Sequence, residues 1–306
     1  MSGARSFKDC TLRQLIGCGC IIVSILLSLI SSGARAQSSS NQKLLKDPIG
    51  NFVFDASLGN PAPPITVYYY RPNQIDPGTR VVFLMHGSSR TAQEARDLGA
   101  VYGKKHNFIL LAPEFSERNY PGDTYAFGNM LGPDGKLLPE SMWAFATIER
   151  VFDRVREELR LRTATYDIVG HSAGGQLVHR LVLFAPHLRF RRAVASSPGR
   201  YALPKMSESF PYGFKGTLLD SSILARAFSR DFVLVLGDRD TDDRVRETEA
   251  MSQGSNRFAR GLRFFAIATE EANLLKVALA WRLRIAYGVD HSPRSAVQAG
   301  FEELLR

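Results

Sequence analysis

Tyr166–Ala185, YDIVGHSAGGQLVHRLVLFA, is the stretch that decides the fold. A short apolar run meets the turn Gly170–Gly175. From Leu177 to Phe184 apolar residues then recur every three or four positions, which predicts a helix immediately after the turn. In a G-x-S-x-G turn between a strand and a helix, the serine lies at a strained apex with its hydroxyl clear of the sheet edge. The pattern predicts that Ser172 is a nucleophile; the alternative is a serine that only caps a glycine-rich helix start.

Strand and helix patterns alternate along the rest of the chain. Arg80–Met85 is an almost continuous apolar run, which is typical of a central strand covered on both faces. This alternation predicts an α/β fold with a mostly parallel central sheet and helices on both faces. Ligands of such sheets bind at the carboxyl ends of the strands. Further strands are expected at Ile65–Tyr70, Phe108–Ala112, Arg192–Ser196, Phe232–Leu236 and Trp281–Tyr287, and residues 243–279 are expected to be mainly helical with a break near Gly261.

The 306 residues divide into a leader, a tether and one large domain. Residues 1–36 carry basic residues, then the apolar run Ile21–Ile30, then Ala34-Arg35-Ala36, which together indicate a secretory signal peptide. An uncleaved membrane anchor is the alternative. Residues 37–50 are polar and serine-rich and are expected to form a flexible tether, with the domain at 51–306 and loop insertions at 113–140 and 197–222. The expected location is periplasmic or extracellular, with no stable membrane insertion once the signal is cleaved.

Composition excludes several kinds of site. The only cysteines, Cys10, Cys18 and Cys20, all lie in the leader, so the domain has no disulfide, no cysteine-bound zinc and no cysteine nucleophile. The formal net charge is +9, but the basic residues are spread along the chain, which argues against nucleic acid as a partner. No cofactor and no metal ion are expected.

A serine hydroxyl needs a base to accept its proton and a carboxylate to orient that base. The expected chain order is serine, aspartate, histidine, and of six histidines only His291 follows the strand Phe232–Leu236 that leads to the aspartate. The negative charge that develops on the substrate oxygen needs backbone N–H donors. Ala173 is expected to provide one donor, and Ser88 or its neighbour the other.

Four short motifs together resemble the α/β-hydrolase superfamily. They are Gly-His-Ser-Ala-Gly-Gly at 170–175, His-Gly-Ser at 86–88, Gly-Asp-Arg-Asp at 237–240 and Gly-Val-Asp-His-Ser at 288–292. More narrowly, the chain is similar to exported esterases of the polyhydroxybutyrate-depolymerase and feruloyl-esterase type. The resemblance implies an α/β-hydrolase fold and a serine hydrolase that uses a covalent acyl-enzyme.

The same resemblance selects the acid. Asp238, Asp240, Asp242 and Asp243 crowd one loop, and the resembling enzymes place the aspartate three residues beyond the glycine that ends the strand, which is Asp240. The spacing of carboxylates over 238–249 also suggests an EF-hand calcium loop. Its sixth position is Asp243 rather than glycine, however, and a strand rather than a helix precedes it.

The expected function is therefore a secreted serine hydrolase that cleaves carboxylic esters, whether small or polymeric, through Ser172, Asp240 and His291. The two alternatives are an exported peptidase with the same triad and a non-catalytic binding protein built on this fold. Aromatic residues of the two insertions are expected to contact the substrate if the insertions wall the cleft, with surface packing as the alternative: Phe115, Tyr120, Tyr125, Tyr201, Tyr212 and Phe214.

Overall fold

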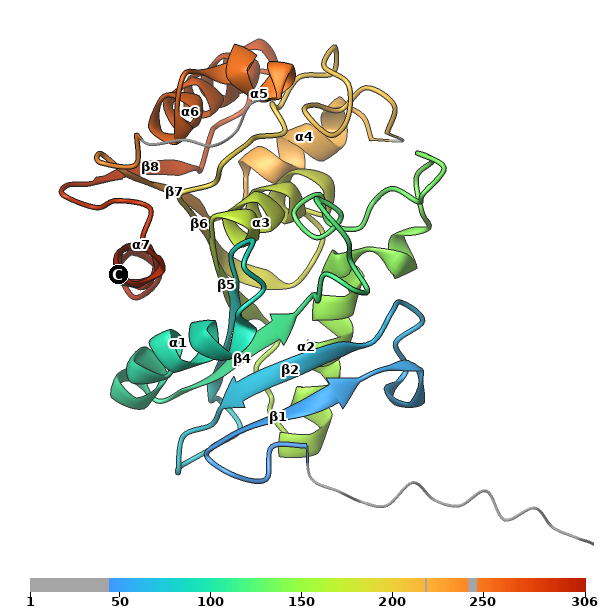
Figure 1. The fold of residues 1–306 in the computed structure, drawn as a ribbon, viewed down its shortest axis with the longest axis vertical. Helices are drawn as coiled ribbons and strands as arrows, with labels where there is room; N and C mark the ends of the chain where they lie inside the picture. The colour runs from blue at the N-terminus through green and yellow to red at the C-terminus, as the bar shows by residue number, and fades with distance from the viewer. Residues whose placement is uncertain (1–43, 218, 242–246) are drawn as a thin grey trace, which may run out of the picture. The chain divides into compact units, whose positions relative to one another are not determined.

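The computed structural model describes residues 44–217, 219–241 and 247–306, and over these residues one eight-stranded mixed sheet organises the chain (Figure 1). Its strand order is β1-β2-β4-β3-β5-β6-β7-β8, and only the β1–β2 and β2–β4 pairs are antiparallel. The carboxyl ends of β3 to β8 therefore meet at one edge of the sheet. The strands are β1 Ile49–Phe54, β2 Ile65–Tyr70, β3 Arg80–Met85, β4 Phe108–Glu114, β5 Tyr166–His171, β6 Phe190–Ser196, β7 Phe232–Gly237 and β8 Arg282–Ala286.

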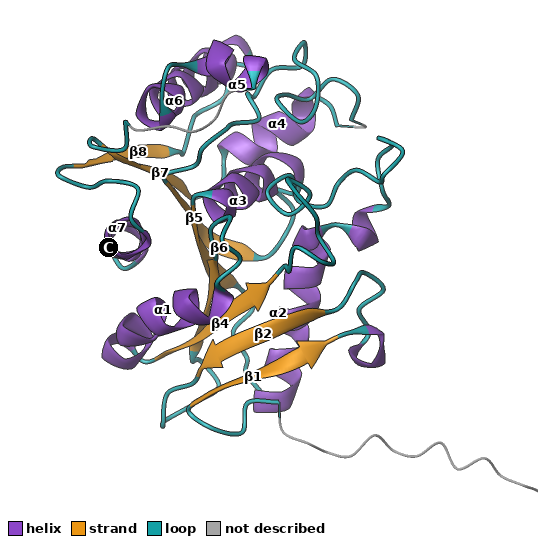
Figure 2. Cartoon of the chain, viewed as in Figure 1, coloured by secondary structure: helices purple, strands orange, loops and turns teal. Residues whose placement is uncertain are grey.

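Helices cover both faces of this sheet (Figure 2). The helices α1 and α7 pack on one face, where α1 contacts β4 and α7 contacts β5 and β6. The helices α2, α3, α4 and α6 contribute to the core on the opposite face. Their bounds are α1 Ala92–His106, α2 Ala144–Leu159, α3 Ala173–Phe184, α4 Ser221–Phe228, α5 Thr248–Gln253, α6 Arg257–Leu274 and α7 Pro293–Leu304, with short 3₁₀ turns at Ala56–Leu58 and Glu140–Met142.

The central strand β3 shows why the sequence produces this layering. Side chains alternate between the faces of a strand, so Phe83 and Met85 enter one core cluster while Val82 and Leu84 enter the other. All four side chains are completely buried. Only a strand covered on both faces can use such a continuous apolar run, and this confirms the predicted α/β architecture.

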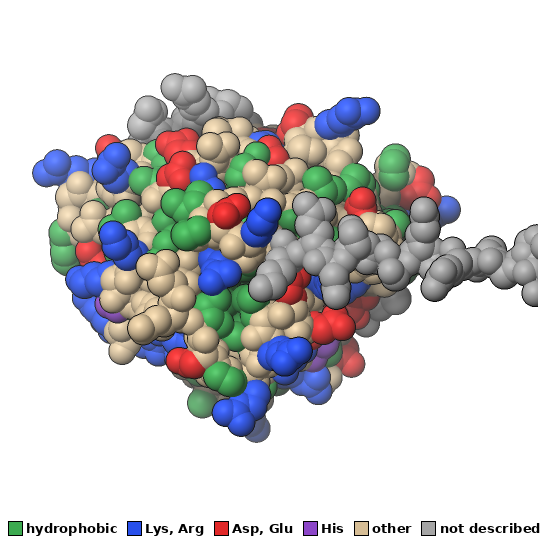
Figure 3. All heavy atoms as spheres, turned by 90° about the horizontal axis from the view of Figure 1, so that it is seen from below, with side chains coloured by type: hydrophobic (Ala, Val, Ile, Leu, Met, Phe, Trp, Pro, Cys, Tyr) green, Lys and Arg blue, Asp and Glu red, His purple; other side chains and the backbone are tan. Residues whose placement is uncertain are grey.

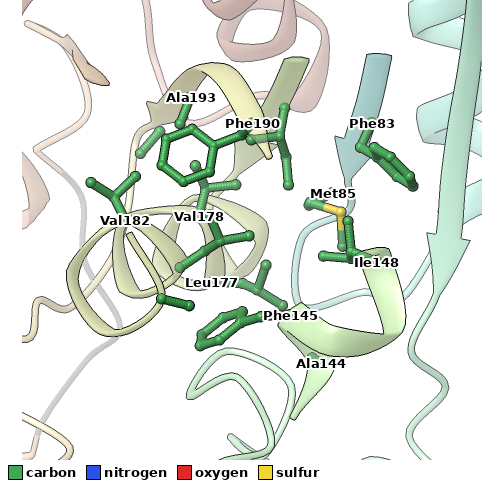
Figure 4. Close-up of a cluster of buried hydrophobic side chains, with 14 of the residues drawn as sticks. Phe83, Met85, Ala144, Phe145, Ile148, Leu177, Val178, Val182, Phe190 and Ala193 are labelled. Atoms are coloured by element: carbon green, nitrogen blue, oxygen red, sulfur yellow. The ribbon is translucent and has the colours of Figure 1, made fainter. Parts of the chain in front are cut away.

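The larger core cluster lies between the sheet and helices α2 and α3, directly behind the turn that follows β5. Figure 4 shows these side chains meeting between the two helices and strands β3 and β6. Burial of each large apolar side chain contributes about 1.5–3 kcal/mol, so the cluster holds α3 firmly against the sheet. The labelled residues are Phe83, Met85, Ala144, Phe145, Ile148, Leu177, Val178, Val182, Phe190 and Ala193.

Two expectations about the chain need correction. The described part of the expected tether, residues 44–50, belongs to the folded domain, because Leu45 is fully buried and β1 begins at Ile49. The helical region after β7 breaks at Gly254–Asn256 and not near Gly261, which packs inside α6 against Leu236. The expected signal peptide, residues 1–36, and the tether residues 37–43 lie outside the described residues.

Lys and Arg side chains are scattered over the face shown in Figure 3, with Asp and Glu side chains between them. No helix in the described ranges combines the length and the apolar character that crossing a membrane requires.

Candidate active site

Ser172 is the single residue between β5 and α3. Its backbone has φ 54° and ψ −113°, a conformation that non-glycine residues rarely adopt. The turn closes so tightly that a Cβ atom on Gly170 would lie 2.2 Å from the carbonyl oxygen of Gly174. A Cβ atom on Gly174 would lie 2.2 Å from the carbonyl oxygen of Met85 on the neighbouring strand. The glycines thus permit the turn, and such a conformation at Ser172 costs about 1–3 kcal/mol, which the packing of α3 must offset.

Three side chains from distant parts of the sequence form one hydrogen-bonded chain at the carboxyl edge of the sheet. The Ser172 Oγ hydroxyl donates to Nε2 of His291 at 3.0 Å. Nδ1–H of the same imidazole donates to Oδ2 of Asp240 at 2.8 Å. This arrangement leaves Nε2 free to accept the serine proton and gives Asp240 the means to stabilise an imidazolium.

Strand ends position these partners. Asp240 follows β7 by three residues, and its backbone N–H donates to the carbonyl of Gly237 at 3.1 Å, which closes a turn. His291 lies between β8 and α7. The neighbouring carboxylate Asp238 turns away from the imidazole and accepts from the backbone N–H of Gly288 at 2.7 Å.

Asp240 is only 2% exposed, and its second oxygen contacts an arginine. Nη1 of Arg257, the first residue of α6, donates to Oδ1 of Asp240 at 3.2 Å. The carboxylate therefore bridges the imidazole of His291 and a guanidinium. Sequence inspection missed Arg257, because no motif links the start of α6 to the loop after β7.

The turn after β3, which is expected to hold the second N–H donor, is fixed by a neutral histidine. Nδ1–H of His86 donates to the carbonyl of Gly87 at 2.8 Å, and Nε2 accepts from the backbone N–H of Phe115 at 3.1 Å. Burial lowers the pKa of His86 to about 4, so the ring is neutral at physiological pH. Tyr125 stacks on this ring and donates its hydroxyl to the His86 carbonyl. His86 is accordingly a structural residue that holds Gly87 and Ser88 beside Ser172.

Arg90 fastens the first insertion to the same turn. Its guanidinium donates to the backbone carbonyls of Phe115, Tyr120 and Gly122, and it lies 4.7 Å from the centroid of the Tyr125 ring. One buried side chain thus satisfies three loop carbonyls that secondary structure leaves unpaired. Sequence inspection missed this residue too, because its partners are backbone atoms 25 to 32 positions away.

His171, beside Ser172, is a second neutral histidine. Its ring centroid lies 5.1 Å from that of His291. Burial first, and the nearby His291 second, lower the pKa of His171 to about 3. It therefore adds no positive charge beside His291.

Two cavities of different character open at Ser172. The first, of about 180 Å³, also contacts His291 and the turn Gly87–Ser89 after β3, and apolar side chains from β3, α1 and α7 line it, including Met85, Leu98 and Val297. The second, of about 320 Å³, contacts Ala173 and is largely polar. Its other lining residues come from the turn between β3 and α1, both insertions, α3 and α6: Ser88, Arg90, Glu117, Gly122, Asp123, Tyr125, Ala126, Gln176, Gly199, Arg200 and Arg257.

Most of the aromatic residues expected to contact the substrate lie elsewhere. Phe115, Tyr120, Tyr201 and Phe214 are at most 1% exposed and pack in the main core cluster, so the expectation that they wall the cleft does not hold. They are buried because the insertions fold back onto the domain; Tyr120, for example, donates its hydroxyl to the carbonyl of Pro63. Tyr212 lines a separate groove with Leu203 and Phe210. Of the six, Tyr125 alone borders the polar cavity among the described residues, although its side chain is also completely buried and belongs to the same core cluster.

The possible calcium loop at 238–249 is only partly described, because residues 242–246 lie outside the described residues. Within the rest, Asp240 is engaged with His291 and Arg257, and Asp238 with the backbone of Gly288. No group of three or more potential metal ligands occurs among the described residues.

Two solved structures resemble this chain along almost its whole folded length. A poly(aspartic acid) hydrolase from Sphingomonas sp. KT-1 is 36% identical, with a TM-score of 0.82 over 86% of this chain and 100% of that one. A poly(3-hydroxybutyrate) depolymerase from Bordetella parapertussis is 28% identical, with a TM-score of 0.81 over 87% of this chain and 92% of that one.

More distant structures share the fold alone. A fluorophosphonate-binding serine hydrolase from Staphylococcus aureus is 16% identical, with a TM-score of 0.52 over 85% of this chain and 96% of that one. No protein-family model matches the sequence, and no curated protein matches it.

Proposed function

Because the chain belongs to the α/β-hydrolase superfamily, we propose that it is a serine hydrolase that cleaves carboxylic esters through Ser172, His291 and Asp240. The observation that carries the proposal is the continuous hydrogen-bonded chain from Ser172 Oγ through the imidazole to the buried carboxylate. The similarity to two polymer hydrolases supports a polymeric substrate beside small esters. We also propose that the enzyme is exported, with residues 1–36 as its signal; the basic residues, the apolar run Ile21–Ile30 and Ala34-Arg35-Ala36 support this part of the proposal.

In the proposed reaction, the Ser172 oxygen attacks the ester carbonyl while its proton passes to Nε2 of His291. The backbone N–H groups of Ala173 and Ser88 stabilise the oxyanion. The imidazolium, held by Asp240, then protonates the alkoxide as the C–O bond breaks, leaving an acyl-serine. Water then attacks the acyl-serine while His291 takes its proton, and the imidazolium returns this proton to Ser172 Oγ as the carboxylic acid leaves.

Amide cleavage is the second candidate. It is favoured by the 36% identity to a poly(aspartic acid) hydrolase, because poly(aspartic acid) is joined by amide bonds. The same three side chains would serve, with His291 protonating an amine instead of an alkoxide.

Labelling with a fluorophosphonate probe tests the nucleophile. The wild-type protein should form a covalent adduct, and Ser172→Ala should form none and lose about 10⁶-fold in kcat. Ser88→Ala is the matched control, because it removes a hydroxyl from the same cavities and keeps its backbone N–H. Labelling of the Ser172→Ala variant would contradict the assignment. A panel of p-nitrophenyl esters and peptide anilides then separates ester from amide cleavage.

A further inference from the structure

We propose that the alcohol part of the substrate is a neutral, largely apolar chain, which passes from Ser172 through the apolar cavity and continues along a surface groove between α1 and α7. The inference deepens the proposed function and rests on it. It makes Leu98, where the cavity meets the groove, a determinant of substrate choice.

The position of His291 places the alcohol part in the apolar cavity. In the proposed reaction the imidazole delivers its proton to the departing oxygen, so the leaving group lies on the side of His291. The apolar cavity contacts both Ser172 and His291, whereas the described residues that line the polar cavity do not include His291. Pro293, which begins α7 two residues after His291, also lines the apolar cavity. A chain on the departing oxygen therefore enters this cavity first.

The apolar cavity continues into a groove on the protein surface. This groove, of about 490 Å³, lies between α1 and α7, which pack on the same face of the sheet (Figure 1). Glu94, Leu98 and Val297 line both spaces, so the cavity and the groove meet at these side chains. From Glu94 to Tyr102, the two ends of the groove on α1, the helix rises about 12 Å. Together the two spaces accommodate a much longer chain than the cavity alone.

Apolar side chains follow one another along this path. Met85 lines the cavity, Leu98 and Val297 lie where the cavity meets the groove, and Val101 and Tyr102 line the groove beyond them. Val101 is 67% exposed, so an apolar side chain of the groove faces solvent. An alkyl chain that covers it removes apolar surface from water, which favours binding.

The charged side chains of the groove argue against an acidic chain. Among the described residues that line the cavity or the groove, Arg294 is the only lysine or arginine, and Glu94 and Asp97 are carboxylates. Asp97 pairs with Arg96 at 2.7 Å. A chain that carries carboxylates would meet Glu94 where the cavity meets the groove, and like charges repel. The path therefore suits a neutral chain.

The walls of the groove are held in place by packing. Tyr102 stacks on Phe301 of α7 with ring centroids 4.4 Å apart, and Phe301 is completely buried. Gly99 holds α1 close to the sheet, since a Cβ atom there would lie 2.6 Å from the side chain of Leu110. A groove with fixed walls binds a chain without the cost of ordering its own side chains, which increases the affinity for that chain.

Two esters of the same molecular formula test which half of the substrate the path binds. Hexyl acetate carries its long chain on the alcohol side, ethyl hexanoate carries it on the acyl side, and ethyl acetate is the short reference. In the wild-type enzyme kcat/KM for hexyl acetate should exceed that for ethyl acetate by at least about tenfold, because each fully buried methylene contributes up to about fourfold. Ethanol and hexanol are almost equally acidic as leaving groups, so this ratio measures binding.

Leu98→Asn exchanges an apolar side chain for a polar one of similar size where the cavity meets the groove. The ratio of hexyl acetate to ethyl acetate should fall to within about threefold of one, and the ratio of ethyl hexanoate to ethyl acetate should keep its wild-type value. The ratios are the readout, since a merely structural role would lower all three rates equally. Leu262→Asn is the matched control on α6, where Leu262 is 39% exposed, and it should keep both ratios.

Val101→Asn tests the groove separately from the cavity. Because Val101 is largely exposed, the substitution should leave the fold intact. It should lower kcat/KM for octyl acetate relative to butyl acetate by about threefold or more, since only the longer chain extends beyond the cavity. An unchanged ratio would overturn the assignment of the groove.

Three further results would overturn the proposal while leaving the ester hydrolase intact. They are equal kcat/KM values for hexyl and ethyl acetate in the wild type, a preference for hexyl acetate that survives Leu98→Asn, and a loss in Leu98→Asn that is confined to ethyl hexanoate. The last would place the acyl chain in the apolar cavity. Absence of hydrolysis of every ester together with absence of fluorophosphonate labelling would overturn the proposed function instead.

Discussion

Two aspartates buried to the same degree, each 2% exposed, lie at opposite edges of one sheet. At the amino edge, Oδ2 of Asp167 in β5 accepts from Arg80 at 2.6 Å and from Arg191 at 2.8 Å. These arginines stand on β3 and β6, the two strands beside β5. At the carboxyl edge, Asp240 meets His291 and Arg257.

The difference between the two sites shows what separates a structural carboxylate from the carboxylate that we propose to be catalytic. Both are desolvated, and both need positive partners. Both partners of Asp167 are arginines, which stay charged at every physiological pH, so this site only ties three strands together. One partner of Asp240 is an imidazole, which can gain and lose a proton and which contacts a strained serine. Burial by itself therefore does not distinguish the two aspartates; the titratable partner of Asp240 is what supports its proposed role.

Replacing each aspartate by asparagine tests this comparison with the largest effect. Asp240→Asn should lower kcat by about 10⁴-fold with the fold retained, because the amide cannot hold the imidazole in the productive tautomer. Asp167→Asn should leave kcat within a few-fold and lower the free energy of unfolding by about 1–3 kcal/mol. Steady-state kinetics of both variants measures kcat, and urea unfolding measures their free energy of unfolding. A large loss of kcat in Asp167→Asn would break the distinction between the two edges.

A substitution in the turn after β3, which holds the proposed oxyanion donor Ser88, tests the same comparison with a smaller expected loss of kcat. Ser88→Pro removes one backbone N–H at the carboxyl edge and should lower kcat by about 10²–10³-fold, because a single oxyanion donor is worth that much. Ser88→Ala keeps the N–H and should retain the wild-type rate. Circular dichroism checks that the proline variant is folded. A folded Ser88→Pro enzyme with full activity would move the donor to a neighbouring residue.

The buried histidines of the carboxyl edge predict the smallest effect, a loss of stability in acid. Folding lowers the pKa of His86 to about 4 and that of His171 to about 3 from the ordinary value of 6.5. For each histidine, at pH values between its folded-state pKa and 6.5, the unfolded chain binds a proton that the folded chain does not. Their stabilisation is thus complete above about pH 6.5 and decreases as the pH falls, by up to about 1.4 kcal/mol per pH unit for each histidine.

Urea unfolding at pH 7, 6 and 5 measures the slope of the free energy of unfolding against pH. His171→Asn should flatten it by about one proton, because it removes one of the groups that titrate only in the unfolded chain. Equal slopes for the wild type and the variant would show that folding does not change the protonation of His171, which would contradict the lowered pKa.

Much of the fold was predictable because its signals are local. The continuous apolar run of β3 requires cover on both faces, and the glycines at 170, 174 and 175 are the residues that the closely packed turn allows. The tether prediction failed at residues 44–50, because a polar segment with a single buried leucine gives no periodic signal. The break between α5 and α6 was misplaced, since Gly261 serves close packing inside a helix, not a turn.

The aromatic residues of the insertions show a different limit. Their aromatic side chains, placed in long insertions, suggested contact with the substrate. Whether a tyrosine faces a cleft or the core, however, depends on how the whole loop folds back onto the domain. In the first insertion Arg90 helps to hold the loop through three backbone carbonyls, and such partners leave no pattern in a sequence.

By itself the sequence determined the strand–turn–helix around Ser172, the α/β architecture and the position of His291 behind the last strand, because each depends on neighbouring residues or on chain order. Tertiary structure alone decided that His291 meets Asp240 while Asp238 faces Gly288, that Arg257 joins Asp240, and that one cavity is apolar and the other charged. Such contacts join distant residues: His291 lies 51 positions from Asp240 and 119 positions from Ser172 in the sequence. Only the packing of helices on both faces of the sheet brings such residues within hydrogen-bonding distance, and no local propensity encodes that distance.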